Sequence, residues 1–241
     1  MLDLLLASSS RSHPGGHLDH LLDPVRGWAS GLREVLFVPW ARTDHAGYTA
    51  TVRASLDRIG LDVRGLEEAD DPVGAVEAAD AVFVGGGNTF LLLDTLQRTG
   101  VLPALAERVR SGALRYLGTS AGTNVACPTI QTTNDMPVVW PVDGPTAMGL
   151  VPVQVNAHYL DADPGSIHQG ETRLQRLAEY HEHHATPVLG LREHGWLRVR
   201  GTGAVVHGAP HDDRAPAVLV RPTAPVVDVP DGASLADLGV G

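Results

Sequence analysis

Lysine is absent from this chain of 241 residues, so all 18 of its basic residues are arginines. They stand against 28 aspartates and glutamates, which gives a formal net charge of −10 at pH 7. A protein that binds nucleic acid needs a basic surface that neutralises phosphates. The charge balance therefore predicts that nucleic acid is not a partner.

Cysteine and long apolar runs are also scarce. The single cysteine, Cys127, excludes an internal disulfide and is typical of a reducing compartment. No stretch approaches the roughly 20 apolar residues of a membrane-spanning helix. Residues 1–7 form an apolar run that is too short for a signal peptide and has no basic segment. We expect a cytoplasmic protein, monomeric or homodimeric, that does not bind membranes.

Short apolar segments alternate with helical ones along most of the chain. Strands are expected at residues 2–7, 35–38, 61–66, 81–84, 114–117, 151–155 and 188–191. Helices are expected at 17–29 (interrupted at Pro24), 48–59, 72–79, 90–97, 102–110 and 170–184. Apolar strands separated by helices are typical of a parallel sheet that is covered on both faces.

The last part of the chain has a different pattern. From Trp196 onward, short strands at 197–199, 204–207 and 217–221 alternate with Gly or Pro turns, which predicts antiparallel hairpins at a sheet edge. The irregular stretch 129–148 is interpreted as an active-site loop. The fold class is therefore α/β, with a mostly parallel sheet, helices on both faces and an antiparallel C-terminal edge, in a single domain of residues 1–241.

A serine stands between two glycines directly after the strand expected at 114–117. Residues 118–122, GTSAG, fit the G-x-S-x-G nucleophile elbow, and they have the strand–turn–helix context that this motif requires. In one interpretation Ser120 is a nucleophile, and in the other it caps a helix. In both, it lies at the carboxyl end of a strand, where α/β sheets bind ligands.

A serine nucleophile needs a base and a third group that orients the base. Among the 12 histidines, His158 is the candidate base because it follows the strand expected at 151–155. Glu193 follows the next strand and could orient the imidazole. Asp135 and Asp161 are rival third members, since a carboxylate on a nearby loop could also hold the ring.

Two other groups of histidines and the cysteine are given no catalytic role. His13, His17 and His20 are expected to face solvent. The histidines of the sequence HEHH at 181–184 end a helix and lack the spacing of a metal-ligand pair, so no metal is expected. Cys127 is expected to be a buried small hydrophobe.

A glycine-rich loop, Gly85-Gly86-Gly87-Asn88, follows the strand expected at 81–84. Glycines let the backbone approach a substrate closely, and the N–H groups entering a helix point toward the strand ends. The backbone at Gly87 and Asn88, with the amide of Ala121, is therefore expected to hold an oxyanion. A dinucleotide-binding loop is the alternative, but the last glycine of G-x-G-x-x-G is missing.

Four segments together resemble one family: VGGGNTFLLL, GTSAGTNVACPTIQTTNDMPVV, VNAHYLD and GETRLQR. They are similar to the peptidase E family, the aspartyl dipeptidases, whose fold is like that of class I glutamine amidotransferases. The resemblance covers about residues 35–201. It implies an intracellular serine peptidase that hydrolyses dipeptides with an N-terminal aspartate, without a metal or other cofactor.

The resemblance also implies roles for particular residues. Ser120 corresponds to the nucleophile, His158 to the general base and Glu193 to the glutamate of the triad, while Asp135 matches an aspartate also proposed for the relay. Two positions depart from the family pattern. Members usually have Asn-Pro-His where this chain has Asn-Ala-His at 156–158, and their glycine directly follows the glutamate, whereas here it is Gly195. The second change puts the place of Glu193 in question.

An acidic protein that binds an aspartyl side chain needs a local cation, best a guanidinium. Arg173, near the start of the helix expected at 170–184, is the candidate, and pairing with Glu171 is the alternative role. Thr132, Thr133 and Asn134 are expected to add polar contacts to the substrate.

Two other functions remain alternatives to a dipeptidase. One is a cyanophycinase-like exopeptidase, which cleaves β-linked aspartyl dipeptides. The other is a non-catalytic binding module on an amidotransferase-like fold, in which the serine remains as a helix cap. The stretch 129–137 speaks against the first, and the set of Ser120, His158 and Glu193 speaks against the second.

Overall fold

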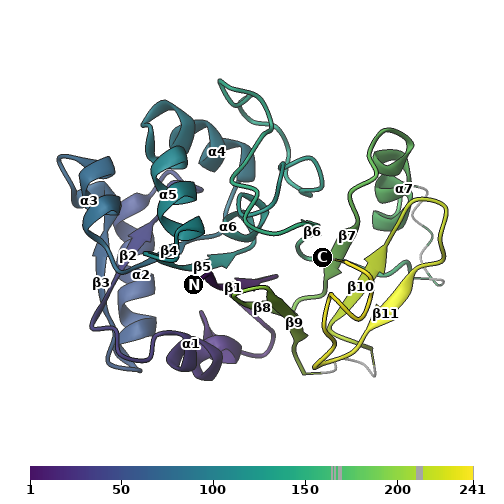
Figure 1. Cartoon of the computed structure of the whole chain (residues 1–241), viewed down its shortest axis with the longest axis horizontal. Coiled ribbons are helices and arrows are strands. Elements are labelled where there is room, and N and C mark those ends of the chain that lie inside the picture. Colours follow the sequence, from purple (N-terminus) through teal and green to yellow (C-terminus); the bar gives the residue numbers. More distant parts are fainter. Residues whose placement is uncertain (164, 166, 168–169, 210–213, 241) are drawn as a thin grey trace.

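The main sheet has seven strands in the order β3-β2-β4-β5-β1-β8-β9 (Figure 1). This computed structural model describes residues 1–163, 165, 167, 170–209 and 214–240. The strands are β1 (Asp3–Ala7), β2 (Glu34–Val38), β3 (Asp62–Gly65), β4 (Ala81–Val84), β5 (Arg115–Thr119), β8 (Trp196–Arg200) and β9 (Gly203–His207). The first five run parallel, and β8 and β9 are antiparallel. The predicted parallel sheet with an antiparallel edge is confirmed.

Helices cover both faces of this sheet. One face carries α3 (Pro72–Ala78), α4 (Thr89–Arg98), α5 (Val101–Arg110) and α6 (Ala121–Asn124), and the other carries α1 (Leu22–Trp28) and α2 (His45–Asp57). Two short 3-10 turns, η1 (Asp19–Leu21) and η2 (Leu66–Glu68), complete this part. In β1, Leu4 and Leu6 pack on the first face, while Leu5 and Ala7 pack on the second. Because side chains alternate along a strand, a fully apolar strand fills both layers.

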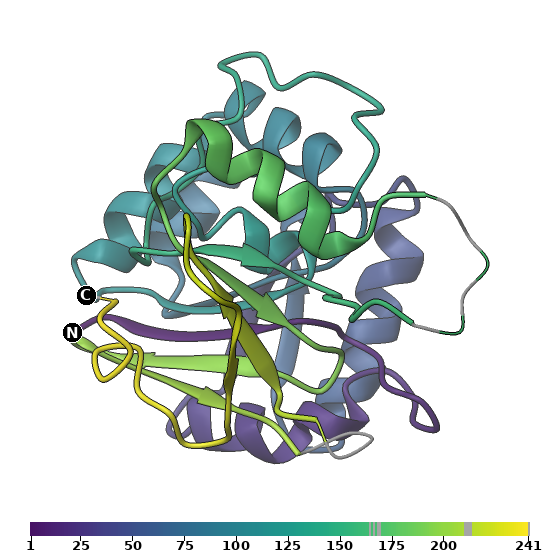
Figure 2. The same cartoon turned by 90° about the vertical axis from the view of Figure 1, so that its right-hand side faces the viewer.

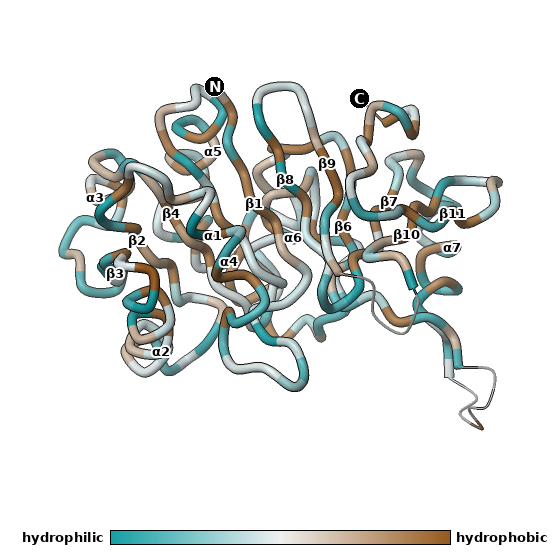
Figure 3. The backbone as a smooth tube through the Cα atoms, turned by 90° about the horizontal axis from the view of Figure 1, so that it is seen from below, coloured by the Kyte–Doolittle hydropathy of each residue, from teal (hydrophilic) through white to brown (hydrophobic). Residues whose placement is uncertain are grey.

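The hydropathy of the backbone follows this layering. Hydrophobic residues concentrate along the central strands β1, β2 and β4, and hydrophilic residues gather in the connecting loops (Figure 3). Among the described residues, no helix is long and apolar enough to cross a membrane.

A second sheet of four strands, in the order β11-β10-β7-β6, lies beside the main one. Its strands are β6 (Gln154–Asn156), β7 (Val188–Leu191), β10 (Ala217–Val220) and β11 (Val227–Val229), and α7 (Arg173–His183) packs against it through Leu177 (Figure 2). The sequence predicted one sheet, and this was wrong, because the apolar pattern identifies a strand but not its partner. The expected strand at 151–155 is also shorter, beginning only at Gln154.

Candidate active site

The tight turn at Ser120 joins β5 to α6. Ser120 has φ 52° and ψ −109°, a backbone conformation that side chains rarely adopt. Both glycines of the motif are needed for close packing. A Cβ on Gly122 would lie 2.0 Å from the carbonyl oxygen of Val84, and one on Gly118 would lie 2.6 Å from that of Gly122. The motif thus brings α6 against the sheet and holds the serine at the strand end.

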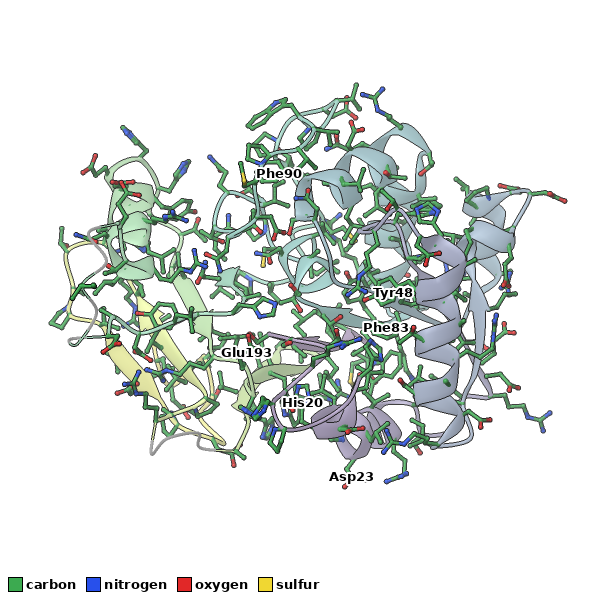
Figure 4. The ribbon with its side chains drawn as sticks, turned by 180° about the vertical axis from the view of Figure 1, so that it is seen from behind. His20, Asp23, Tyr48, Phe83, Phe90 and Glu193 are labelled. Atoms are coloured by element: carbon green, nitrogen blue, oxygen red, sulfur yellow. The ribbon has the colours of Figure 1, made fainter. Side chains whose placement is uncertain are left out.

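Ser120, His158 and Glu193 form a continuous chain of hydrogen bonds. The Oγ of Ser120 lies 2.9 Å from Nε2 of His158, and Nδ1 of the same ring lies 2.6 Å from Oε1 of Glu193. The side chains of His158 and Glu193 are 38% and 40% exposed, so a ligand can reach the ring. Glu193 lies in the region between the two sheets (Figure 4).

This chain of hydrogen bonds connects the two sheets. Ser120 belongs to the main sheet, whereas His158 and Glu193 follow β6 and β7 of the second sheet. Ser8, at the end of β1, is fully buried at the junction. Its hydroxyl donates to the carbonyl oxygen of Leu191 at 2.8 Å and accepts from the backbone N–H of His158 at 2.8 Å. Because His158 has a positive φ of 54°, this bond helps to hold an unfavourable backbone conformation.

The pKa of Glu193 is lowered from its ordinary value by its neighbours. Burial acts to raise this pKa, but the hydrogen bond and the charge of His158 outweigh burial, and the Ser9 hydroxyl and His194 act in the same direction. Glu193 is therefore a carboxylate at neutral pH. As a carboxylate it accepts a hydrogen bond from Nδ1–H, which leaves Nε2 free to accept a proton.

The displaced glycine does not move Glu193 away from the ring. Gly195 closes a turn in which its N–H donates to the carbonyl oxygen of Arg192 at 2.8 Å. A Cβ at Gly195 would lie 2.3 Å from the carbonyl oxygen of Pro216, so only glycine fits here. Its own carbonyl accepts from the N–H of Ser8 at 3.0 Å. The turn therefore anchors the Glu193 segment to the end of β1.

Two backbone N–H groups near Ser120 have no acceptor among the described residues: those of Gly87 and Ala121. A Cβ on Gly86 would lie 3.1 Å from the Cβ of Ser120, so the glycine loop touches the serine. The expectation for Asn88 is wrong, because its N–H donates to the carbonyl oxygen of Ala41 at 2.8 Å. Its side chain instead caps α4.

Asp135 and Asp161 do not contact the imidazole. Oδ2 of Asp135 accepts from the backbone N–H and the hydroxyl of Thr89, at 2.8 and 2.5 Å, and so caps the start of α4. Asp161 pairs with Arg192 and Arg214 instead, which lowers its pKa. Of the three carboxylates that could orient the imidazole of His158, only Glu193 forms a hydrogen bond with it among the described residues.

The segment 132–134 supports the histidine rather than lining the cavity. The hydroxyl of Thr132, which is 3% exposed, donates to the carbonyl oxygen of Val155. Asn134 donates to the carbonyl oxygen of Ala157 at 2.6 Å, and Thr133 contacts Thr89 and Asp135. The expected substrate contacts of these three side chains are therefore replaced by bonds that fix the turn before His158.

A cavity of about 660 Å³ opens above Ser120. It is lined by Ser120, His158, Glu193 and Asp135, by Gly86, Gly87 and Arg42, by residues 9–13 and Gly15, and by His194. Nothing in the sequence analysis pointed to residues 9–13 or to Arg42. Residues 9–13 follow β1, so the rule that sites lie at strand carboxyl ends, applied to the first strand, would have found them.

Arg173 does not line this cavity but borders a neighbouring depression with Asp161, Asp163 and Glu171. Burial and Arg176 lower the pKa of Arg173, while Asp135 acts in the opposite sense, so its guanidinium lies within electrostatic range of that carboxylate. Glu171 pairs with Arg176 instead, and Arg173 forms no ion pair within the part of the chain that the structure describes. The alternative of a Glu171–Arg173 pair is therefore wrong.

Two of the other histidines and the cysteine are buried. His17 and His20 are mostly buried, contrary to the expectation that they face solvent, and burial lowers the pKa of each. Cys127 is buried, as expected, and burial raises the pKa of its thiol to about 12. Among the described residues, no group of three or more His, Cys, Asp or Glu side chains is placed to hold a metal ion.

Comparison with known proteins gives a consistent result. The family profile described as peptidase family S51 matches residues 4–207. Peptidase E of Streptomyces coelicolor is 52% identical over 224 residues, which cover 93% of this chain and 90% of that protein. A Drosophila melanogaster protein named as a probable alpha-aspartyl dipeptidase is 48% identical over 208 residues, covering 86% of each chain.

The fold has a similar counterpart among solved structures. A crystal structure of a protein from Listeria monocytogenes EGD-e, described as a candidate peptidase E, superposes with a TM-score of 0.66 at 25% identity. The superposition covers 87% of this chain and 99% of that one.

Proposed function

The chain belongs to peptidase family S51, and on this basis we propose that it is a serine dipeptidase that hydrolyses dipeptides with an N-terminal aspartate. Its relatives include proteins named peptidase E and alpha-aspartyl dipeptidase, which supports this substrate class. The observation that carries the proposal is the unbroken hydrogen-bond chain from Ser120 through His158 to Glu193 at the edge of a cavity.

In the proposed reaction, Ser120 Oγ attacks the carbonyl carbon of the peptide bond while its proton passes to Nε2 of His158. Glu193 stabilises the imidazolium without taking the proton. The C–N bond then breaks, and the leaving amine takes the proton from His158. Water, deprotonated by the same ring, hydrolyses the acyl-enzyme and releases aspartate.

The negative charge that develops on the carbonyl oxygen needs donors that have no other partner. The N–H groups of Gly87 and Ala121 meet this requirement, since neither has an acceptor among the described residues. We assign them to the oxyanion. Removing one such donor in other serine hydrolases lowers kcat by about a hundredfold or more.

The N-terminal aspartate carries an ammonium group and a carboxylate, and the site offers one complementary charge for each. The Asp135 carboxylate lines the cavity, and its Oδ1 forms no hydrogen bond with the described residues, so we assign it to the ammonium. Arg173 interacts electrostatically with Asp135 and forms no ion pair with the described residues, so we assign it to the side-chain carboxylate.

A panel of dipeptides that differ only in the first residue tests this proposal. We expect Asp-Leu to be cleaved much faster than Asn-Leu or Ala-Leu. Arg173→Gln should reduce the preference for Asp over Asn by about tenfold to a hundredfold, the worth of a charged hydrogen bond. Arg176→Gln is the matched control on the same helix, since it pairs with Glu171. Equal cleavage of all three dipeptides by the wild-type protein would refute the substrate assignment.

The proposal extends to the organisation of the chain. The nucleophile comes from the main sheet and the base from the second, so we propose that residues 1–241 act as one peptidase domain. We also propose that the protein is cytoplasmic, and that it acts as a monomer or as a homodimer in which each subunit holds its own site.

A further inference from the structure

Two arginines line the cavity above Ser120 and have no role in the reaction described so far. They are Arg11, in the loop after β1, and Arg42, in the loop after β2. Neither forms an ion pair within the described part of the chain. In a protein with a net charge of −10, two guanidiniums in one cavity that lack a carboxylate partner are suited to an anionic ligand.

Arg42 is held in place beside the glycine-rich loop at residues 85–88. Its Nε donates to the carbonyl oxygen of Gly86 at 3.2 Å, and its guanidinium carbon lies 4.0 Å from the centre of the Tyr48 ring. Tyr48 is buried beside Phe83 (Figure 4), and its hydroxyl accepts from the N–H of Gly86 at 2.8 Å. Arg42 is therefore held against the glycine loop that touches Ser120, and its terminal nitrogens have no acceptor among the described residues.

His17 shows that both guanidiniums act on the same side of the cavity. Its ring packs edge-on against Tyr48 at 6.2 Å. Burial first, and then the charges of Arg11 and Arg42, lower the pKa of His17 to about 4. The backbone of His17 also bridges that of Arg11, and Arg42 lies over the same Tyr48 ring. Both arginines therefore lie beside His17.

We propose that Arg11 and Arg42 form a subsite for the free α-carboxylate of the leaving amino acid. The inference rests on the proposed function, because it assumes that a dipeptide is bound at Ser120. Three backbone bonds separate the scissile carbonyl carbon from the terminal carboxyl carbon, so the carboxylate lies within about 5 Å of the reacting atom. A receptor for it must therefore belong to this same cavity.

The charges in and beside the cavity fix the direction of the substrate. The aspartyl residue needs one anion and one cation, which Asp135 in the cavity and Arg173 in the neighbouring depression supply, whereas the leaving residue needs cations alone, which Arg11 and Arg42 supply. A longer peptide has a neutral amide in place of this carboxylate. The subsite consequently gives the enzyme its preference for peptides of two residues.

The test compares Asp-Leu with its C-terminal amide, which differs only in the charge at the leaving end. We expect wild-type kcat/KM to be about tenfold to a hundredfold higher for the free acid than for the amide. In the Arg11→Gln/Arg42→Gln double variant, the loss on the acid should exceed the loss on the amide by about tenfold or more. Arg33→Gln, which removes the same charge at the opposite end of β2, should keep the wild-type ratio.

Several outcomes would overturn the subsite. One is a wild-type protein that cleaves acid and amide equally, and another is a double variant that loses both equally, as expected if the arginines only support the glycine loop. A change in the preference for Asp over Asn would instead assign them to the aspartyl side chain.

Failure of the proposed function has a different signature, which is no cleavage of either substrate. Calorimetry then decides the subsite without catalysis. The Ser120→Ala protein should bind Asp-Leu more tightly than the amide, and the difference should vanish when both arginines are replaced. Equal binding of the two compounds by the Ser120→Ala protein would refute the inference.

Discussion

Replacing Ser8 with alanine should lower both stability and turnover, although Ser8 touches no substrate. The substitution removes a fully buried hydroxyl that joins the backbone N–H of His158 to the carbonyl oxygen of Leu191. The N–H of His158 would lose its acceptor, whereas the carbonyl oxygen of Leu191 would keep the hydrogen bond from the N–H of Tyr159 at 2.9 Å. At about 1–3 kcal/mol for the one group left unsatisfied, the free energy of unfolding should fall by about 1–3 kcal/mol.

The effect on turnover follows from the backbone of His158. With φ at 54°, this residue holds a conformation that costs about 1–3 kcal/mol and persists only while its surroundings enforce it. Once the bond from Ser8 is lost, the turn can relax and shift the imidazole away from Ser120. A displacement of about 1 Å at a catalytic group can cost a hundredfold, so we expect kcat to fall by about tenfold to a hundredfold with little change in KM.

Urea unfolding and steady-state kinetics on Asp-Leu measure the two effects. Ser55→Ala is the matched control, because it also removes a buried serine hydroxyl that donates to a backbone carbonyl, that of Thr51, and its second partner is the ring of His17 rather than the backbone of His158. It should lose stability and keep its kcat. If Ser8→Ala lost stability but kept the wild-type kcat, the hydroxyl would only join the sheets, and the argument about the His158 backbone would be refuted.

Further predictions concern single residues in the site and in the core. Glu193→Gln should lower kcat for every accepted dipeptide, whereas Asp135→Asn should raise KM most for substrates with a free α-amine. Kinetics on Asp-Leu and its N-acetyl form measure both effects, and the assignments would be refuted if Asp135→Asn lowered kcat and Glu193→Gln raised KM instead. Ser120→Ala should lower kcat by a factor on the order of 10⁶. Alkylation of the wild-type protein at pH 8 should leave its activity unchanged, because burial raises the pKa of the Cys127 thiol to about 12. Inactivation in step with labelling of the thiol would contradict this expectation for Cys127. Burial, reinforced by two guanidiniums, lowers the pKa of His17 from 6.5 to about 4, so the unfolded state binds the extra proton between these values. The free energy of unfolding should then fall by up to about 3 kcal/mol as the pH drops through this window; urea titrations at pH 7 and pH 4.5 should show a smaller fall for His17→Gln, and an identical fall would exclude His17 as its source.

Local patterns were enough to predict the main sheet and the tight turn that holds Ser120 at the end of β5. The apolar strand β4 was predicted with its observed ends, because four apolar residues between helices have few other places in a protein. Ser120 followed from the spacing of two glycines, each of which proves to be required by a close backbone approach. Such short-range requirements leave a direct trace in the sequence.

The pairing of strands that are distant in the sequence could not be predicted from local patterns. The apolar pattern of β7 and β10 is the same whether they extend the main sheet or form a second one, so the second sheet was not predicted. The run of serines after β1 has the composition of an ordinary loop. The importance of Ser8 depends on groups 150 and 183 residues away, and the sequence gives no indication of those contacts.

The division of the catalytic groups between two sheets has a consequence for biosynthesis. A ribosome delivers Ser120 first and His158 only 38 residues later, and the strand that positions Glu193 follows after that. Domains acquire structure as the chain emerges. Throughout that interval the nascent protein carries a serine that no base activates. We therefore expect hydrolysis to begin only when the later segments have docked, and a chain that terminates before β7 to be inactive.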